Sequence, residues 1–292
     1  MRVGVVDLGT NSMRLLITDG AVETGRWVEV TGLGRGIDQT GVLSPDGVEK
    51  TLIALGGFGR LMDDAAVAKR AAIATSATRD AANRAEFLER AGDALGVIPQ
   101  VVSGEREGRL AYAGAASDLA GGPTPIVSDI GGGSTEFVSE KGVISVDIGS
   151  VRLTERLLPN RPAGADELRA ARAHVSGLFA RAPVAAGSEV VGVAGTWTSL
   201  AAIDLDLPAY RRERVHHHRI TRRALAELTE KLASMTLART ADIPGLDPAR
   251  APVILAGAVV AESVLDALDA GSVLVSERDS LDGLASELLG LP

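Results

Sequence analysis

Short apolar runs alternate along this chain with longer stretches in which apolar residues return every three or four positions. Short runs bounded by glycine or proline predict buried strands, and the longer stretches predict amphipathic helices. Strands that alternate with helices are typical of an α/β fold. Two hairpins are predicted, one that begins at residue 3 and one at 126–139. Further strands are predicted at 20–41, 71–74, 97–102, 143–149, 189–194 and 272–276. The predicted helices lie at 45–65, 79–95, 105–119, 165–181, 196–204, 251–269 and 280–289.

One arrangement of apolar run, glycine turn and second apolar run occurs twice. The first copy continues from Asp7 as Asp-Leu-Gly-Thr-Asn-Ser, and the second continues from Asp129 as Asp-Ile-Gly-Gly-Gly-Ser. When Asp7 is aligned with Asp129, the glycine two positions later and the serine five positions later also coincide. Each copy predicts a β-hairpin, and the repetition predicts two α/β domains related by an internal duplication.

The boundary between the two predicted domains lies at the strongest break in the chain. Residues 121–125 read Gly-Gly-Pro-Thr-Pro, which neither a helix nor a strand tolerates well. A chain of 292 residues is long enough for two hydrophobic cores. We expect domains at 1–121 and 122–292, with the last helix, at about 280–290, able to pack back on the first domain.

The composition of the chain argues against several classes of protein and of site. The chain has no cysteine, which excludes disulfides, thiolate metal sites and a cysteine nucleophile. The net charge of −8 disfavours a general nucleic-acid binder. No apolar run is expected to reach the length of a membrane span, and residues 1–20 carry Asp7 and Asp19 where a signal peptide would be apolar. We therefore expect a cytoplasmic protein with neither a nucleic-acid partner nor a membrane partner.

The two glycine turns predict phosphate binding. Glycine lets backbone N–H groups approach an anion, and the serine adds a hydroxyl donor. One such turn alone would be an ordinary hairpin, but the second contains three consecutive glycines, which are entropically costly unless a ligand must come close to the backbone. Asp129 and Glu136 flank that second turn and would repel phosphate unless a cation lay between them. These carboxylates predict Mg²⁺, or Mn²⁺ in its place, with Asp7 as a third candidate ligand.

Several longer motifs extend this pattern over nearly the whole chain. They are Asp-Leu-Gly-Thr-Asn-Ser at 7–12 with Arg14, Ala-Thr-Ser-Ala-Thr-Arg-Asp-Ala-Ala-Asn at 74–83, Ser-Gly-Glu-Arg-Glu at 103–107, Asp-Ile-Gly-Gly-Gly-Ser-Thr-Glu at 129–136, Gly-Ser-Val-Arg-Leu-Thr-Glu at 149–155, Ala-Gly-Thr at 194–196 and Ser-Glu at 276–277. Through these motifs the chain resembles the exopolyphosphatase/guanosine-pentaphosphate phosphohydrolase (Ppx/GppA) family, within the superfamily of actin, Hsp70 and sugar kinases. In its length it resembles the short, two-domain type found among actinobacteria.

This resemblance implies a fold and an activity. The fold would be two actin-like (ribonuclease H-like) domains with the active site in the cleft between them. The activity would be Mg²⁺-dependent hydrolysis of terminal orthophosphate from inorganic polyphosphate by a cytoplasmic homodimer. We also expect short chains to be preferred, because an acidic chain offers few cationic contacts to a long polyanion. The alternatives are a pppGpp 5′-phosphohydrolase of the stringent response, a non-catalytic phosphate or nucleotide sensor, and a kinase of the same superfamily.

The resemblance also implies the site residues. It assigns catalysis to Glu107, which on its own would be an ordinary solvated residue in the first turn of a helix. Arg106 stands where the family usually has a first glutamate, and this change could alter local charge and substrate preference. The implied phosphate ligands are Gly9, Thr10, Asn11, Ser12, Arg14, Arg79, Gly131, Gly132, Gly133, Ser134, Gly195 and Thr196.

Residues 211–223 form the most basic stretch of an otherwise acidic chain. Either they are a solvated loop, or Arg211, Arg212, Arg214, His216 and Arg219 form a cationic surface for a polyanion. The three histidines at 216–218 suggest a metal site, which we disfavour because consecutive residues of a strand point to opposite faces. Because the chain ends at 292 and carries a net charge of −8, we expect too few cationic contacts to retain long polyphosphates.

Overall fold

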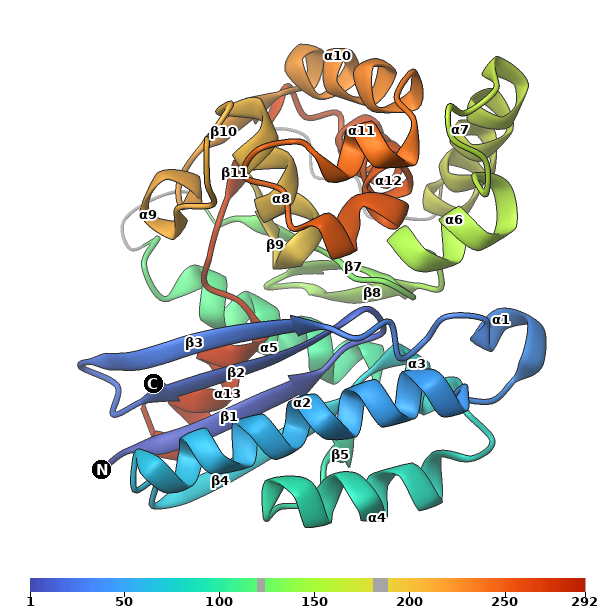
Figure 1. The fold of residues 1–292 in the computed structure, drawn as a ribbon. Helices are drawn as coiled ribbons and strands as arrows, with labels where there is room; N and C mark the ends of the chain where they lie inside the picture. The colour runs from blue at the N-terminus through green and yellow to red at the C-terminus, as the bar shows by residue number, and fades with distance from the viewer. Residues whose placement is uncertain (120–123, 181–188, 292) are drawn as a thin grey trace. The chain divides into compact units, whose positions relative to one another are not determined.

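The computed structural model describes residues 1–119, 124–180 and 189–291. These residues form two compact units (Figure 1). Unit 1 comprises Met1–Gly114 and Arg278–Pro292, and unit 2 comprises Ala115–Glu277. The domain boundary expected at 121/122 lies outside the described residues.

The sheet of unit 1 is built on the first hairpin. Its strand order is β3-β2-β1-β4-β5, from β1 (Val3–Leu8), β2 (Ser12–Thr18), β3 (Glu23–Val30), β4 (Lys69–Ala74) and β5 (Gln100–Val101). The first three strands are antiparallel to one another, and β4 and β5 run parallel to β1. The expected strand at 97–102 is confirmed only as the two residues of β5.

Helices cover both faces of this sheet. Helices α2 (Pro45–Asp64) and α4 (Arg84–Leu95) lie on one face, and α13 (Ser280–Leu289) lies on the other with α5 (Gly104–Ala116) beside it (Figure 1). Val6 and Leu8 of β1 belong to the core under α2, whereas Val3 and Val5 belong to the core under α13. This division follows from the strand geometry, because successive side chains point to opposite faces. The short helices of the unit are α1 (Ile37–Thr40) and α3 (Ser76–Asp80).

Unit 2 repeats the topology of unit 1. Its strand order is β10-β11-β9-β6-β7-β8, from β6 (Ile126–Ile130), β7 (Thr135–Ser139), β8 (Gly142–Val146), β9 (Val190–Val193), β10 (Arg219–Thr221) and β11 (Ser272–Val275). The series β8-β7-β6-β9-β11 has the same order and the same strand directions as β3-β2-β1-β4-β5. Both sheets are mixed and each starts from one copy of the repeated hairpin, which confirms the α/β fold class.

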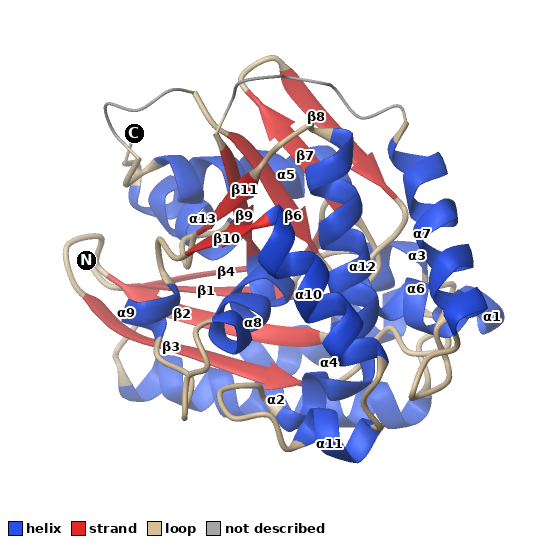
Figure 2. Ribbon diagram, turned by 90° about the horizontal axis from the view of Figure 1, so that it is seen from above, coloured by secondary structure: helices blue, strands red, loops and turns tan. Residues whose placement is uncertain are grey.

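The helices of unit 2 surround one apolar helix, α12 (Ala251–Ala267), which packs on α6 (Ser150–Leu157), α7 (Ala165–Phe179), α8 (Ala194–Asp204) and α10 (Arg222–Ala233). Figure 2 shows these helices from above, with the short helices α9 (Arg212–Val215) and α11 (Leu237–Ala241). Residues Pro248–Ala267 are long and apolar enough to cross a membrane by length and composition alone, so the expectation that no run has that length is wrong. However, 72% of the most apolar window is buried, which is typical of the core helix of a soluble protein.

Two other sequence predictions differ from the structure. The helix expected at 79–95 is broken between α3 and α4, because the Asn83 side chain binds the backbone N–H and carbonyl of Leu43 at 2.9 and 3.0 Å. Helix α6 was not predicted, and α10 was expected only as the helix that a solvated loop at 211–223 would lead into. Thr221 caps α10 by accepting from the Ala224 N–H at 3.1 Å.

Helices α5 and α13 approach each other closely at two glycines. A Cβ on Gly283 of α13 would lie 2.2 Å from the Leu110 carbonyl oxygen, and a Cβ on Gly114 of α5 would lie 1.9 Å from the Asp279 carbonyl oxygen. Both neighbours are backbone atoms that cannot turn aside. Alanine at either position would therefore force the two helices apart.

We predict that Gly283→Ala lowers the free energy of unfolding by about 2 kcal/mol, the usual scale for overpacking. The matched control is Gly57→Ala in α2, where a Cβ meets nothing within 4 Å. The control should raise stability by about 0.5–1 kcal/mol, because alanine favours helix more than glycine does. Urea unfolding of both variants checks the pair, and equal midpoints would contradict the close helix contact.

Candidate functional site

The first glycine turn joins β1 to β2 in unit 1. The Gly9 N–H donates to the Ser12 carbonyl at 3.1 Å and leaves Thr10 and Asn11 at the tip. A Cβ on Gly9 would lie 2.8 Å from the Ser12 carbonyl oxygen, so only glycine allows this tight closure.

The carbonyls of this turn are bound by the segment that follows β3. The Thr10 carbonyl accepts from the Gly34 N–H at 2.8 Å, and the Asn11 carbonyl accepts from the N–H groups of Thr31 and Gly32 at 3.1 and 2.9 Å. In a planar trans peptide the N–H of the next residue points opposite to the carbonyl. The N–H groups of Asn11 and Ser12 therefore point away from residues 31–34, as donors at an anion site must.

Buried polar atoms lie in this part of unit 1. Among the described residues, four buried side-chain atoms of the turn and its surroundings make no hydrogen bond: Asp7 Oδ1, Asn11 Oδ1, Ser76 Oγ and Thr78 Oγ1. Helix α3 contacts the turn, because the Ala77 N–H donates to Thr10 Oγ1 at 3.3 Å. Buried polar groups of this kind are costly unless a ligand or water binds them. Ser76 and Thr78 were not assigned from the sequence, although both belong to the motif at 74–83.

Arg14 and Asp7, which face each other across β1 and β2, belong to a buried ion-pair network. Arg14 donates to the carboxylates of Asp7 and Asp279, and its Nη2 also donates to Ser280 Oγ at 3.0 Å. Ser280 Oγ in turn donates to Asp7 Oδ2 at 3.0 Å. The network therefore fixes the start of α13 to the first hairpin. The predicted role of Arg14 in phosphate binding and that of Asp7 in metal binding both stay predictions.

The residue implied for catalysis, Glu107, lies beside Arg79, an implied phosphate ligand, in unit 1. The Arg79 Nη1 and Glu107 Oε2 atoms are 3.6 Å apart, and both side chains are largely buried. Arg79 is held in place because its Nη1 also donates to the Val102 carbonyl at 2.8 Å. Arg106, next to Glu107, forms a two-point ion pair with Glu287 of α13. The arginine that replaces the usual glutamate is thus a link between two helices.

The second glycine turn joins β6 to β7 in unit 2 and has the same closing bond, from the Gly131 N–H to the Ser134 carbonyl at 3.0 Å. Its carbonyls are bound by the start of α6. The Gly131 carbonyl accepts from the Ser150 N–H at 3.0 Å, and the Gly132 carbonyl accepts from two further N–H groups of α6 at 2.9 and 3.1 Å. By the same peptide geometry, the N–H groups of Gly132 and Gly133 point away from α6.

Gly149 makes this contact between turn and helix possible. A Cβ at this position would lie 2.6 Å from the Gly131 carbonyl oxygen and from the Gly132 carbonyl carbon. The motif at 149–155 therefore has a structural explanation: it places helix N–H groups against the carbonyl side of the second turn.

Asp129 and Glu136 face each other directly across β6 and β7. Both are buried, with exposed fractions of 4% and 0%, and residues opposite each other in an antiparallel pair share one face of the sheet. Ser145 on β8 continues the row and donates to Glu136 Oε1 at 2.8 Å. Two adjacent buried carboxylates repel each other, and a divalent cation would offset that repulsion. This all-oxygen set fits Mg²⁺.

The equivalent row in unit 1 differs in charge. Asp7 and Arg14 occupy the places in the first hairpin that Asp129 and Glu136 occupy in the second. The duplicated hairpin therefore carries an acid and a base in one copy and two acids in the other. Only the second copy has the donor set of a hard metal ion.

The motif at 194–196 follows β9 and begins α8. Ala194 has a left-handed φ of 69°, which is unusual for a residue with a side chain, and Thr196 is buried. A Cβ on Gly195 would lie 2.1 Å from Arg250 Nη1, so the guanidinium lies directly over this glycine. Arg250 had not been identified from the sequence. No motif surrounds it, and only the fold places it beside Gly195.

The basic segment is largely paired with carboxylates of unit 2. Arg212 Nε lies 3.3 Å from Glu277 Oε2, and Arg219 pairs with Glu189. Arg211 lies 3.7 Å from its neighbour Glu213. Each such pair reduces the positive charge that this surface could offer to a polyanion.

The geometry of the three histidines differs from the sequence expectation. His216 and His217 do not belong to a strand: they follow α9, and β10 starts only at Arg219. His217 has a left-handed φ of 63°, and its ring stacks on that of His216 with centroids 3.8 Å apart. The argument that consecutive side chains point to opposite faces is therefore wrong here. Burial and the neighbouring His217 lower the pKa of His216, and Asp118 offsets this effect only in part.

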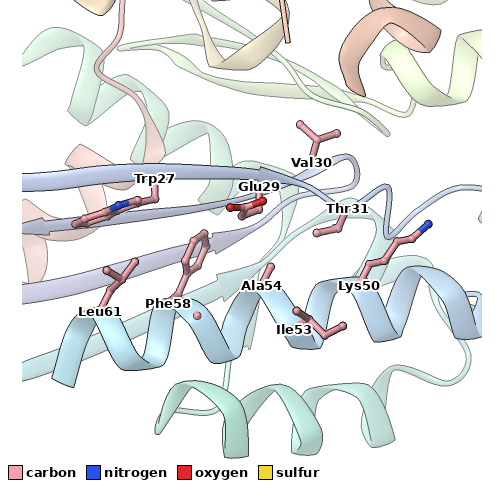
Figure 3. A pocket seen from close by; sticks show the side chains of 10 residues that line it. Trp27, Glu29, Val30, Thr31, Lys50, Ile53, Ala54, Phe58 and Leu61 are labelled. Atoms are coloured by element: carbon pink, nitrogen blue, oxygen red, sulfur yellow. The ribbon is translucent and has the colours of Figure 1, made fainter. Parts of the chain in front are cut away.

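A pocket of about 420 Å³ lies between β3 and α2 (Figure 3). Its walls are mainly apolar and include Trp27, Phe58 and Leu61. Lys50, the only cationic residue that lines it among the described residues, forms an ion pair with Asp46 at 2.7 Å. None of the residues assigned to phosphate from the sequence lines this pocket, and its apolar walls do not suit a polyanion.

Comparison with known proteins adds to this geometry. Residues 26–290 match the model of the Ppx/GppA phosphatase family. The chain is 36% identical to Exopolyphosphatase 2 of Mycobacterium tuberculosis over 99% of both chains. It is 31% identical to Exopolyphosphatase 1 of the same organism, over 97% of this chain and 87% of the relative.

Two solved structures are similar over nearly their whole length. An exopolyphosphatase-like protein has a TM-score of 0.92 at 31% identity, with 99% of each chain covered. The Ppx/GppA family member of Aquifex aeolicus has a TM-score of 0.82 at 32% identity, with 99% of this chain and 98% of that chain covered.

Proposed function

This chain belongs to the Ppx/GppA phosphatase family, and we propose that it is a phosphoanhydride hydrolase that removes terminal orthophosphate from inorganic polyphosphate. The observation that carries the proposal is the second hairpin. Its glycine turn directs two N–H groups away from α6, and the paired carboxylates of Asp129 and Glu136 lie on its strands. Phosphate donors and hard metal ligands on one hairpin are what phosphoryl transfer requires.

We assign the metal-binding role to Asp129 and Glu136. Mg²⁺ prefers carboxylate and phosphate oxygens and would neutralise the charge that develops on the transferred phosphoryl group. The row of Asp129, Glu136 and Ser145 supplies only oxygen atoms. Asp7 is a weaker candidate, since one of its oxygens already accepts from Arg14 and Ser280.

Glu107 is the group that we assign to the attacking water. Its carboxylate would accept a proton from the water or orient it towards the terminal phosphorus. Arg79, beside it, would bind a phosphate oxygen through the same guanidinium that keeps Glu107 in place. A sensor that only binds phosphate would have no use for this carboxylate.

Phosphate release measured in parallel on short polyphosphate, long polyphosphate, pppGpp and ATP, with Mg²⁺, tests the proposal. Polyphosphate should be the best substrate. A higher kcat/KM for pppGpp would make the chain a pppGpp phosphohydrolase. Tight binding of all four without release would make it a sensor.

We predict that Glu107→Gln lowers kcat by at least about a hundredfold, the usual scale for loss of a general base, while substrate binding persists. The matched control is Glu105→Gln on the same helix, an exposed residue paired with Arg109. The control should keep wild-type activity. Steady-state phosphate release and calorimetric binding of polyphosphate measure the two effects. A kcat within about tenfold of wild type for Glu107→Gln would reject the assignment.

We predict that Glu136→Gln raises the Mg²⁺ concentration for half-maximal activity by at least about tenfold. Mutation of a residue that only hydrogen-bonds to a metal ligand already weakens metal affinity by about that factor. Glu140→Gln, an exposed residue just after β7, is the control and should leave the Mg²⁺ dependence unchanged. Mg²⁺ titration of phosphate release measures both variants. An unchanged Mg²⁺ dependence of Glu136→Gln would remove this residue from the metal site.

We further propose that short polyphosphates are preferred and that release is distributive. A processive enzyme must hold a polyanion at many cationic points, yet Arg212 and Arg219 are already paired with carboxylates. Intermediate chain lengths should therefore accumulate during digestion, as a gel would show. Disappearance of chains of hundreds of units without intermediates, as fast as short ones, would contradict this proposal.

A further inference from the structure

We propose that Asp118, His216 and His217 form a binding site for one transition-metal ion of the Zn²⁺ type, separate from the carboxylates that we assign to Mg²⁺. Within the part of the chain that the structure describes, these three residues are the group whose potential ligand atoms all lie within 4.8 Å of one another. All three belong to unit 2.

The two imidazole rings converge on one carboxylate oxygen of Asp118. His216 Nε2 lies 2.9 Å from Asp118 Oδ2, and His217 Nε2 lies 3.6 Å from the same atom. The two rings are stacked with an interplanar angle of 27°. Because both Nε2 atoms lie near the same carboxylate oxygen, both rings present Nε2 to it. The left-handed backbone conformation of His217 makes this orientation possible. A hydrogen bond from the His217 N–H to the Val275 carbonyl, at 2.7 Å, stabilises that conformation.

His218 does not join this group. Its Nε2 lies 2.6 Å from Asp204 Oδ2, so the third histidine is directed to a different carboxylate. The segment therefore provides two imidazoles for one site and a third imidazole outside it.

The donor set selects the class of metal. Two imidazoles and one carboxylate suit Zn²⁺ and its neighbours in the first transition row, whereas Mg²⁺ prefers oxygen ligands alone. Three protein ligands leave the fourth tetrahedral position to water. His217 is 42% exposed at its side chain, which gives the ion access to the site. Because the chain has no cysteine, no thiolate of this chain can compete for such an ion.

Metal binding would change one hydrogen bond next to the site. The Glu277 N–H donates to His216 Nδ1 at 3.1 Å, so the neutral ring carries its proton on Nε2. An ion on Nε2 moves that proton to Nδ1, and the Glu277 N–H must then release the ring. The loss of one backbone hydrogen bond is small beside the gain from two bonds between imidazole and metal. The resonance of the Glu277 amide should therefore change when an ion occupies this site.

The ion would also join two segments that are distant in sequence. Asp118 follows α5, whereas His216 and His217 follow α9. A ligand that binds only the folded state stabilises it by mass action. Zn²⁺ should thus raise the melting temperature.

The test uses untagged, chelator-treated protein with Mg²⁺ in excess, so that oxygen-only sites are filled. Competition with a chromophoric chelator should show one Zn²⁺ per chain. The variants His216→Gln, His217→Gln and Asp118→Asn should each bind Zn²⁺ at least about tenfold more weakly, and the matched control His218→Gln should bind like wild type. Circular dichroism of the metal-free variants checks that each has folded.

Two further readouts separate this site from adventitious binding. Co²⁺ in place of Zn²⁺ should give the visible bands of a tetrahedral nitrogen and oxygen site, absent in His217→Gln. The Glu277 amide resonance should shift on addition of Zn²⁺ in wild type and in His218→Gln, but not in His217→Gln. No Zn²⁺ uptake in the presence of Mg²⁺, or equal losses in His217→Gln and His218→Gln, would overturn the proposal.

Discussion

The planar trans peptide bond at two glycine turns is the constraint on which the candidate site depends. At each turn a neighbouring segment binds the carbonyl side: residues 31–34 in unit 1 and the start of α6 in unit 2. Because carbonyl and N–H point in opposite directions across one peptide, this fixes the N–H groups on the other side. The donors are set before any ligand arrives, which lowers the entropic cost of binding an anion.

The two units have the same strand topology but not the same charges. The register places Arg14 opposite Asp7 and Glu136 opposite Asp129, at equivalent points of the two hairpins. The first pair is an internal ion pair that extends to α13, and the second is a carboxylate pair suited to an external cation. One backbone arrangement thus serves structure in one unit and, we propose, metal binding in the other.

Outside the hairpins, too, the role of a charged side chain depends on the residue with which it pairs. From the sequence, Arg106 and the arginines of the basic segment could each offer a positive charge to a ligand. In the structure, however, Arg106 binds Glu287 and Arg212 binds Glu277. Ion pairs of this kind reduce the positive charge available to a ligand. The paired arginines are therefore consistent with a surface that holds few phosphates.

The sequence by itself determined the two hairpins, because glycine and the flanking apolar runs act over a few residues. It also determined α13, whose bounds follow from Asp279 as N-cap and Gly290 with a left-handed φ of 71° as C-cap. Only the tertiary structure decided the break at Asn83, which binds Leu43, and the convergence of Asp118 on His216 and His217. Capping and periodicity are local, whereas the partner of a polar side chain is chosen by packing between segments that the sequence keeps far apart.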